Sequence, residues 1–294
     1  MLDKLKAKIL FEKLLGRPNI DKAYAMVPPT DSWYDTISKV HESVKKLQAL
    51  PHETVKIQSH DGLTLTGLYF PCENARATVI WVHGYTSHGL REGAFPALFY
   101  RSLGCNVLLP YQRAHGPSEG KYITFGALEH RDMMQWVDLM NQQDLPIVIH
   151  GLSMGGTIVL NLADQPMKNV CCLIADAPSS GATDFFRDVA SATFKKSAEA
   201  VNFHLLARFQ KEFGADAGNF HILRRVANSR YPLFLTAGSE EHLEERLAEI
   251  QAACPQETQT LILPGCNHGN GMYKQTDLFQ SALKDFLAKH LNAK

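Results

Sequence analysis

Six short apolar segments, separated by stretches of helical pattern, limit what this chain can fold into. They lie at Thr78–Val82, Asn106–Leu109, Ile147–His150, Cys171–Ala175, Leu233–Thr236 and Thr260–Leu263. The helical stretches include Gly126–Gln143, Met154–Asp164, Glu240–Ala253 and Asp277–Leu291. Short apolar strands that alternate with helices form a parallel sheet covered on both faces. The sequence therefore predicts an α/β fold with a mostly parallel, twisted sheet and helices on both faces.

The first 53 residues lie outside this alternation. Apolar residues recur at helical spacing between lysines from Met1 to Arg17, which predicts a basic amphipathic helix, and Trp33–Leu50 predicts a second helix. Residues 1–53 are therefore interpreted as a helical extension, and residues 54–294 as the main domain. The main domain opens with an alternating stretch, Thr54–Tyr69, and Asp61-Gly62 at its centre predicts a tight hairpin turn with both residues at positive φ.

A long insertion separates the fourth and fifth of the six predicted strands. The segment 179–230 is much longer than a crossover needs and has mostly helical patterning, which is typical of a lid, although an insertion without catalytic effect has the same pattern. It is rich in phenylalanine, at Phe185, Phe186, Phe194, Phe203, Phe209 and Phe213. These side chains fit either an apolar acyl group or a packed helical cap.

The segment Gly151-Leu152-Ser153-Met154-Gly155 has the context of a nucleophile elbow. It follows a predicted strand directly and precedes a helical stretch. A serine can stand on such a sharp corner only if the residues two positions away on either side lack side chains. The corner also places Ser153 at a helix N-terminus, where backbone N–H groups favour developing negative charge. The glycine spacings of dinucleotide-binding and phosphate-binding loops are absent, so Ser153 is the predicted nucleophile.

A serine hydroxyl is a weak nucleophile, so it needs a base and a group that orients the base. His268 is the best-placed histidine, because it lies on a glycine-rich loop after the last predicted strand. The acid is expected after the preceding strand, where Glu241 and Glu240 compete. Asp176, after an earlier strand, is a third candidate.

Two backbone N–H groups are expected to hold the oxyanion. The residue after the nucleophile, Met154, supplies one donor in this architecture, and the loop after the first parallel strand supplies the other, here at Tyr85. His83 and His88 border that loop, but two histidines five residues apart without a matching cluster are a weak signal for a metal. We therefore predict neither a metal nor a cofactor.

Composition excludes several classes of protein. Lys+Arg 30 balances Asp+Glu 30, which argues against a nucleic-acid binder that neutralises phosphates. The six cysteines include no C-x-x-C pair, which is typical of reduced thiols in the cytoplasm. Lysines interrupt the N-terminal apolar residues, so no signal peptide is indicated. Glycines divide the uncharged stretch Pro146–Ala163, so no integral membrane segment is expected.

The motifs together resemble the α/β-hydrolase superfamily over about Thr54–Leu291. They occur in the order of that superfamily: the His83-Gly84 loop, the Gly151–Gly155 elbow, the acid loop at Gly238 and the His268-Gly269 loop. The segment Gln112–Tyr122, with Phe125-Gly126 and Glu129, is similar to a bacterial serine-esterase-like branch of mostly uncharacterised hydrolases. That branch usually has Asp where this chain has Tyr111, and the superfamily usually has Asp where this chain has Glu241. The resemblance implies the α/β-hydrolase fold and a carboxylic-ester or related acyl hydrolase.

The sequence thus favours a cytoplasmic serine hydrolase of small-molecule esters. Acyltransferase, thioesterase, amidase, peptidase and lactonase chemistry would use the same site. A non-catalytic binding protein on the same fold is the alternative from another class. The N-terminal helix could pack on its own domain, or contact a membrane surface, a partner or a second copy in a homodimer.

Overall fold

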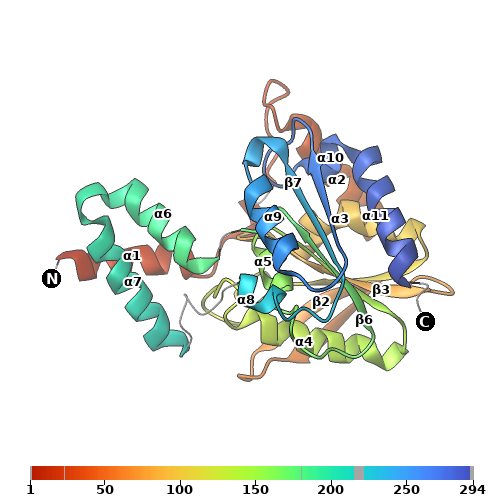
Figure 1. Cartoon of the computed structure of the whole chain (residues 1–294), viewed down its shortest axis with the longest axis horizontal. Helices are drawn as coiled ribbons and strands as arrows, with labels where there is room; N and C mark the ends of the chain where they lie inside the picture. Colours follow the sequence, from red (N-terminus) through yellow and green to blue (C-terminus); the bar gives the residue numbers. More distant parts are fainter. Residues whose placement is uncertain (1, 23, 180, 215–221, 292–294) are drawn as a thin grey trace.

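An eight-stranded sheet runs through the molecule in the order β1-β2-β4-β3-β5-β6-β7-β8 (Figure 1). The structure is a computed structural model that describes residues 2–22, 24–179, 181–214 and 222–291. Parts of the predicted insertion, 180 and 215–221, lie outside the described residues, as do residue 1 and residues 292–294 at the two ends. The strands are β1 Glu53–Gln58, β2 Thr64–Phe70, β3 Ala77–Val82, β4 Cys105–Pro110, β5 Ile147–Leu152, β6 Val170–Asp176, β7 Leu233–Gly238 and β8 Thr258–Leu263.

The strands from β4 to β8 in this order are parallel, and the antiparallel pair β1-β2 joins the sheet beside β4. All six predicted parallel strands and the hairpin are therefore present. The prediction of an α/β fold with a mostly parallel sheet is confirmed.

The turn of the hairpin differs from the prediction. Gly62 has φ 86, but Asp61 is not at positive φ, so a tight Asp-Gly turn is wrong. Instead, the Ser59 N–H donates to the Leu63 carbonyl at 2.8 Å and closes a wider loop. The Asp61 carboxylate accepts a hydrogen bond from the Ser59 hydroxyl at 2.6 Å and pairs with Arg113 at 2.9 Å. Because the Asp61 side chain has these partners, the wider loop is stabilised.

The chain forms eleven helices among the described residues, and most of them cover the two faces of the sheet (Figure 1). They are α1 Leu2–Leu15, α2 Tyr34–Gln48, α3 Gly89–Ser102, α4 Glu129–Met140, α5 Met154–Leu160, α6 Ala182–Phe194, α7 Ala198–Phe213, α8 Ile222–Val226, α9 Glu244–Ala253, α10 Gly271–Lys274 and α11 Thr276–Leu291. Val79 and Trp81 of β3 join the core that contains α2, α3 and α11. Ile80 and Val82 point to the other face, into the core that contains α4, α5 and α9. This alternation is expected of a strand buried on both faces.

Helix α3 was not among the predicted elements, because its glycines and Pro96 argue against a helix. Packing explains why it forms. A Cβ atom at Gly93 would lie 2.8 Å from side-chain atoms of both Leu109 and Trp81. A larger residue at position 93 would hold α3 away from the sheet, so close packing outweighs the poor helix propensity of glycine.

Helices α1, α6 and α7 form a separate group beside the sheet, which we call the lid unit (Figure 1). The buried face of α1, with Phe11 and Leu15, packs on α7. Arg208 of α7 lies 4.2 Å from the Phe11 ring centroid, and its Nη2 is 2.6 Å from Glu12 Oε1. The N-terminal helix thus packs on its own chain. Within the described ranges, no helix combines the length and the apolar character needed to span a bilayer.

Candidate active site

Ser153 stands on the corner between β5 and α5. Its φ of 57° and ψ of −118° are a strained combination for a residue with a side chain. A Cβ atom at Gly151 would lie 2.2 Å from the Gly155 carbonyl oxygen, and one at Gly155 would lie 1.9 Å from the Val82 carbonyl oxygen. Only glycine fits at both positions. The chain can therefore turn sharply enough to present the Ser153 hydroxyl at the carboxyl end of β5.

The structure brings Ser153, His268 and Glu241 together. His268, in the loop after β8, has its Nε2 2.8 Å from Ser153 Oγ. Its Nδ1 is 2.6 Å from Oε2 of Glu241, which lies in the 3-10 turn Ser239–Glu241 after β7. The Gly238 N–H donates to the other carboxylate oxygen, Oε1, at 2.7 Å and fixes the Glu241 side chain. A proton on Nδ1 would leave Nε2 free to accept the serine proton.

The other two candidate acids do not bond to His268 in the contacts of the described residues. The Glu240 N–H donates to the Cys266 carbonyl at 3.0 Å, and its carboxylate accepts from the Ser239 hydroxyl. Asp176 is buried at the end of β6, where its carbonyl accepts the Ser153 N–H at 2.8 Å. Burial, with the Glu241 charge, raises the pKa of Asp176 to about 8. Among the described residues, Glu241 is thus the carboxylate that bonds to His268.

The environment of His268 suits a base. Its side chain is 55% exposed, whereas the Glu241 side chain is 5% exposed. The hydrogen bond to Glu241 raises the pKa of His268 against the opposing effect of burial, and the charges of Asp176 and Glu92 act in the same direction. A buried carboxylate behind the ring stabilises the imidazolium that forms when Nε2 takes a proton.

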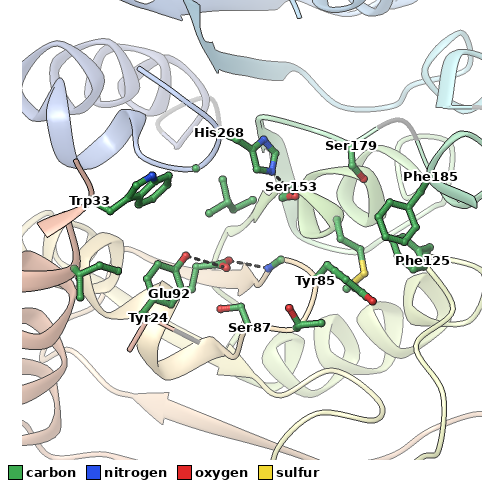
Figure 2. A pocket seen from close by; sticks show the side chains of 16 residues that line it. Tyr24, Trp33, Tyr85, Ser87, Glu92, Phe125, Ser153, Ser179, Phe185 and His268 are labelled. Carbon is green, nitrogen blue, oxygen red and sulfur yellow. Dashed lines mark hydrogen bonds between the residues drawn. The ribbon is translucent and has the colours of Figure 1, made fainter. Parts of the chain in front are cut away.

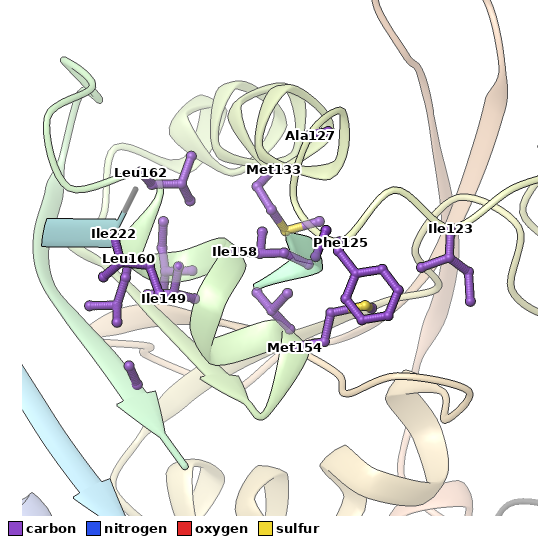
Figure 3. Close-up of a cluster of buried hydrophobic side chains, with 14 of the residues drawn as sticks. Ile123, Phe125, Ala127, Met133, Ile149, Met154, Ile158, Leu160, Leu162 and Ile222 are labelled. Carbon is purple, nitrogen blue, oxygen red and sulfur yellow. The ribbon is translucent and has the colours of Figure 1, made fainter. Parts of the chain in front are cut away.

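The predicted oxyanion donors border the same site. Met154 is the first residue of α5, where a backbone N–H has no acceptor within the helix. Its side chain lies among buried side chains near Phe125 and Ile158 (Figure 3), which anchors the start of the helix. Tyr85 lies in the loop between β3 and α3, and its hydroxyl donates to the Leu14 carbonyl at the end of α1 at 2.6 Å.

Known proteins resemble this chain in sequence and in fold. A family model described as serine aminopeptidase, S33, matches residues 73–210. An uncharacterised protein of Bacillus subtilis (strain 168), YqkD, is 29% identical over 174 residues, which cover 58% of this chain and 52% of YqkD. The match thus spans about half the length of this curated relative.

Solved structures share the fold over most of the chain. The Pyrococcus furiosus esterase Pf2001 superposes with a TM-score of 0.65 at 23% identity, covering 95% of this chain and 99% of that one. Est1E of Butyrivibrio proteoclasticus, solved with ferulic acid bound, has a TM-score of 0.61 at 18% identity and covers 81% of this chain and 99% of its own. The chain has the α/β-hydrolase fold of these structures.

A cavity of about 520 Å³ opens onto Ser153 in this α/β-hydrolase fold. Figure 2 shows Tyr24 and Trp33 on one side, and Phe125 and Phe185 on the opposite side. Phe185 of α6 lies with its ring centroid 5.4 Å from that of Tyr85. The segment between α1 and α2, with Tyr24 and Trp33, and helix α6 of the lid unit therefore supply opposite walls of the pocket.

The sequence did not predict Tyr24, Trp33, Ile37 or Glu92 as pocket residues. The first three reach the site through tertiary packing, and no local pattern marks them. Glu92 carries a weak local signal, because it is a carboxylate between Gly89 and Gly93 of a buried helix. A buried carboxyl group that lines a pocket is a candidate functional residue.

The histidines near the loop have partners within the protein. His83 Nδ1 lies 2.9 Å from the Gly84 carbonyl, and its Nε2 accepts the Gln112 N–H at 3.1 Å. His88 caps α3 by accepting the Arg91 N–H.

A second group, His60, Asp61 and Asp132, also has metal-like spacing. The Arg113 guanidinium lies between its two carboxylates, 2.9 Å from Asp61 and 2.7 Å from Asp132. The charge that a metal ion would supply is thus already supplied by an arginine.

Proposed function

We propose that this chain is a serine hydrolase that cleaves carboxylic esters, with Ser153 as nucleophile, His268 as base and Glu241 as the acid that orients it. The observation that supports the proposal is the continuous line of contacts from Ser153 Oγ to His268 Nε2 at 2.8 Å and from His268 Nδ1 to Glu241 Oε2 at 2.6 Å. This arrangement can deprotonate a serine and stabilise the resulting imidazolium.

The reaction has two halves. Ser153 Oγ attacks the ester carbonyl carbon while its proton passes to His268 Nε2, and the N–H groups of Tyr85 and Met154 hold the oxyanion. His268 then protonates the departing alcohol and leaves an acyl-enzyme. In the second half, His268 deprotonates water, which attacks the acyl carbon; the bond between this carbon and Ser153 Oγ breaks, His268 returns the proton to Ser153 Oγ, and the acid leaves. Each oxyanion donor is expected to contribute about 2.7 to 4 kcal/mol to transition-state stabilisation.

An ester with an apolar acyl or aryl group fits the pocket best. Its walls are mainly aromatic and aliphatic, and Phe125, Phe185 and Trp33 face the space next to Ser153. The Pf2001 protein and Est1E, which share the fold, are named as an esterase and as a protein that binds ferulic acid. Acyl transfer, thioester and amide cleavage would pass through the same acyl-enzyme, so the substrate panel must include them.

The first test uses fluorophosphonate labelling and turnover of p-nitrophenyl esters of increasing chain length. Ser153→Ala is expected to abolish labelling and to lower kcat by about 10⁴-fold or more, because it removes the nucleophile. Ser102→Ala, which changes an exposed serine at the end of α3, is the matched control and should keep both. Undiminished labelling of Ser153→Ala would refute the proposal. Thioester and anilide substrates, and product analysis with a competing alcohol, separate the alternative activities.

A reducing, cytoplasmic location is part of the proposal. It is supported by six cysteines that are all free thiols. The adjacent Cys171 and Cys172 have their sulfur atoms 3.9 Å apart, well beyond a disulfide bond length. Contact with a second copy of the chain stays a prediction.

A further inference from the structure

Glu92 is a buried carboxyl group beside the oxyanion loop that the proposed reaction does not use. It lies in the first turn of α3 and is 2% exposed. Its Oε1 accepts the Gly84 N–H at 2.8 Å, and its Oε2 is 3.5 Å from the Tyr24 hydroxyl. The dashed lines at Glu92 in Figure 2 are these two contacts. A buried carboxyl group is costly to maintain, so its contacts need an explanation.

The Gly84 peptide is confined between this carboxyl group and the nucleophile. A Cβ atom at Gly84 would lie 3.2 Å from Glu92 Oε2 and 3.4 Å from Ser153 Cβ. Gly84 precedes Tyr85, the predicted oxyanion donor. A bond that fixes the Gly84 amide therefore limits the directions in which the Tyr85 N–H can point.

Helix α3 holds Glu92 in place. A Cβ atom at Gly89 would lie 2.8 Å from the Pro110 carbonyl oxygen, so the start of the helix packs tightly on the end of β4. The Tyr273 hydroxyl of α10 donates to the Glu92 carbonyl at 3.3 Å. The acceptor for Gly84 thus comes from a rigid element.

We propose that Glu92 is a positioning residue that orients the oxyanion loop through the Gly84 N–H. The inference rests on the proposed function. A donor stabilises the oxyanion only when it lies about 2.7 to 3.1 Å from the site of the developing charge, so a small rotation of the loop is expected to cost turnover rather than substrate binding.

This role requires a hydrogen-bond acceptor at position 92, and it does not require a charge. The ionisable groups that face Glu92 are Tyr24 from the N-terminal segment, Tyr273 from α10, Asp176 from β6 and His268. Burial raises the pKa of Glu92 to about 7, and its negative charge contributes to the raised pKa of His268. Glutamine keeps the acceptor and removes the charge, whereas leucine removes both.

The test compares Glu92→Gln with Glu92→Leu on a short p-nitrophenyl ester over pH 5 to 9. Glu92→Leu is expected to lower kcat by about 10² to 10³-fold with KM changed less than about threefold, the size of effect seen when one oxyanion donor is lost. Glu92→Gln is expected to restore kcat to within about threefold of the unmodified chain. It should also move the acid limb of the kcat/KM profile to lower pH, because His268 loses a nearby negative charge. Thermal unfolding of each variant checks that it is folded.

A role that is only structural would lower stability and leave the acid limb in place. The proposal is overturned if Glu92→Leu keeps kcat or if Glu92→Gln is as slow as Glu92→Leu. If Glu92→Leu does not fold, Glu92→Ala takes its place as the variant without an acceptor and is compared with Glu92→Gln. Ser153→Ala separates the two proposals. Labelling of Ser153→Ala would refute the proposed hydrolase function. Loss of labelling in Ser153→Ala together with a fully active Glu92→Leu would refute only the positioning role of Glu92.

Discussion

The end of the sheet that carries the proposed triad and the lid unit are held by different interactions. Ser153, Glu241 and His268 follow parallel strands whose backbone ladders fix their relative positions. The lid unit is held by side chains that are distant in sequence, such as the Phe11 and Phe213 rings with centroids 6.0 Å apart. For the proposed hydrolase, we therefore expect turnover to depend on the rigid carboxyl ends of the strands. Substrate selectivity should depend on the pocket walls, which can change without disturbing the proposed triad.

The largest effect is expected at Gly155, where the backbone of the neighbouring strand leaves no room for a side chain. Gly155→Ala would place a Cβ atom 1.9 Å from the Val82 carbonyl oxygen, a backbone atom of the central sheet that cannot move aside cheaply. We expect it to lose about 3 kcal/mol or more of unfolding free energy and to reduce turnover to background. Chemical denaturation and ester turnover measure the two effects.

Gly156→Ala is the matched control at the next position. Its Cβ atom would meet its nearest neighbours at 3.2 Å, and alanine favours the helix, so its stability should change by less than about 1 kcal/mol. Equal losses in the two variants would contradict the view that the close contact at Gly155 decides the geometry.

A smaller but specific effect is expected at the acid. Glu241→Gln should lower kcat by about 10³ to 10⁴-fold, because the His268 tautomer and the imidazolium both lose their carboxylate partner. The hydrogen bond to Glu241 raises the pKa of His268, and the base must be neutral to act. The acid limb of any remaining activity should therefore move to lower pH.

Glu240→Gln is the control, since the Glu240 carboxylate bonds only to Ser239 among the described contacts. Its kcat should stay within about twofold of the unmodified chain. A larger loss in Glu240→Gln than in Glu241→Gln would reassign the acid.

The smallest effect is expected in the lid unit. Phe185 lies 4.8 Å from Phe125 between ring centroids and forms part of the pocket wall. Phe185→Ala should lower kcat/KM about tenfold for long acyl esters while acetate esters change less than about threefold, because a lost apolar contact costs about 1 to 3 kcal/mol. Phe203→Ala on the same unit removes a ring that is 69% exposed and should change neither. Equal losses for short and long esters would show that the lid unit and the chemistry are not separable.

The residues at the carboxyl ends of the strands could be predicted from the sequence, because each follows a local sequence pattern. Gly151, Ser153 and Gly155 meet within one turn, and Glu241 and His268 each follow a strand that can be recognised from a short apolar run. Because these strands are parallel, their carboxyl ends lie at the same end of the sheet, and this brings the three side chains together.

The pocket walls could not be predicted in the same way. Tyr24 and Trp33 contact the site through packing between segments that lie far apart in the chain, and no periodic pattern encodes such contacts. Helix α3 was missed for a related reason, because Gly93 is unfavourable for a helix in isolation and necessary against Trp81. The prediction of a tight Asp61-Gly62 turn was wrong, because the sequence around the turn does not show that the Asp61 side chain pairs with the distant residue Arg113.

The pairing of α1 with α7 sets an order for the assembly of this protein during translation. Lys6 and its partner Ser197 are separated by 191 positions. At roughly 5 to 20 residues per second, a ribosome needs about 10 to 40 s to make the intervening chain. During that interval the Phe11 ring lacks Arg208 and Phe213, which cover it in the folded chain, so nascent α1 exposes an apolar side chain until α7 has been made.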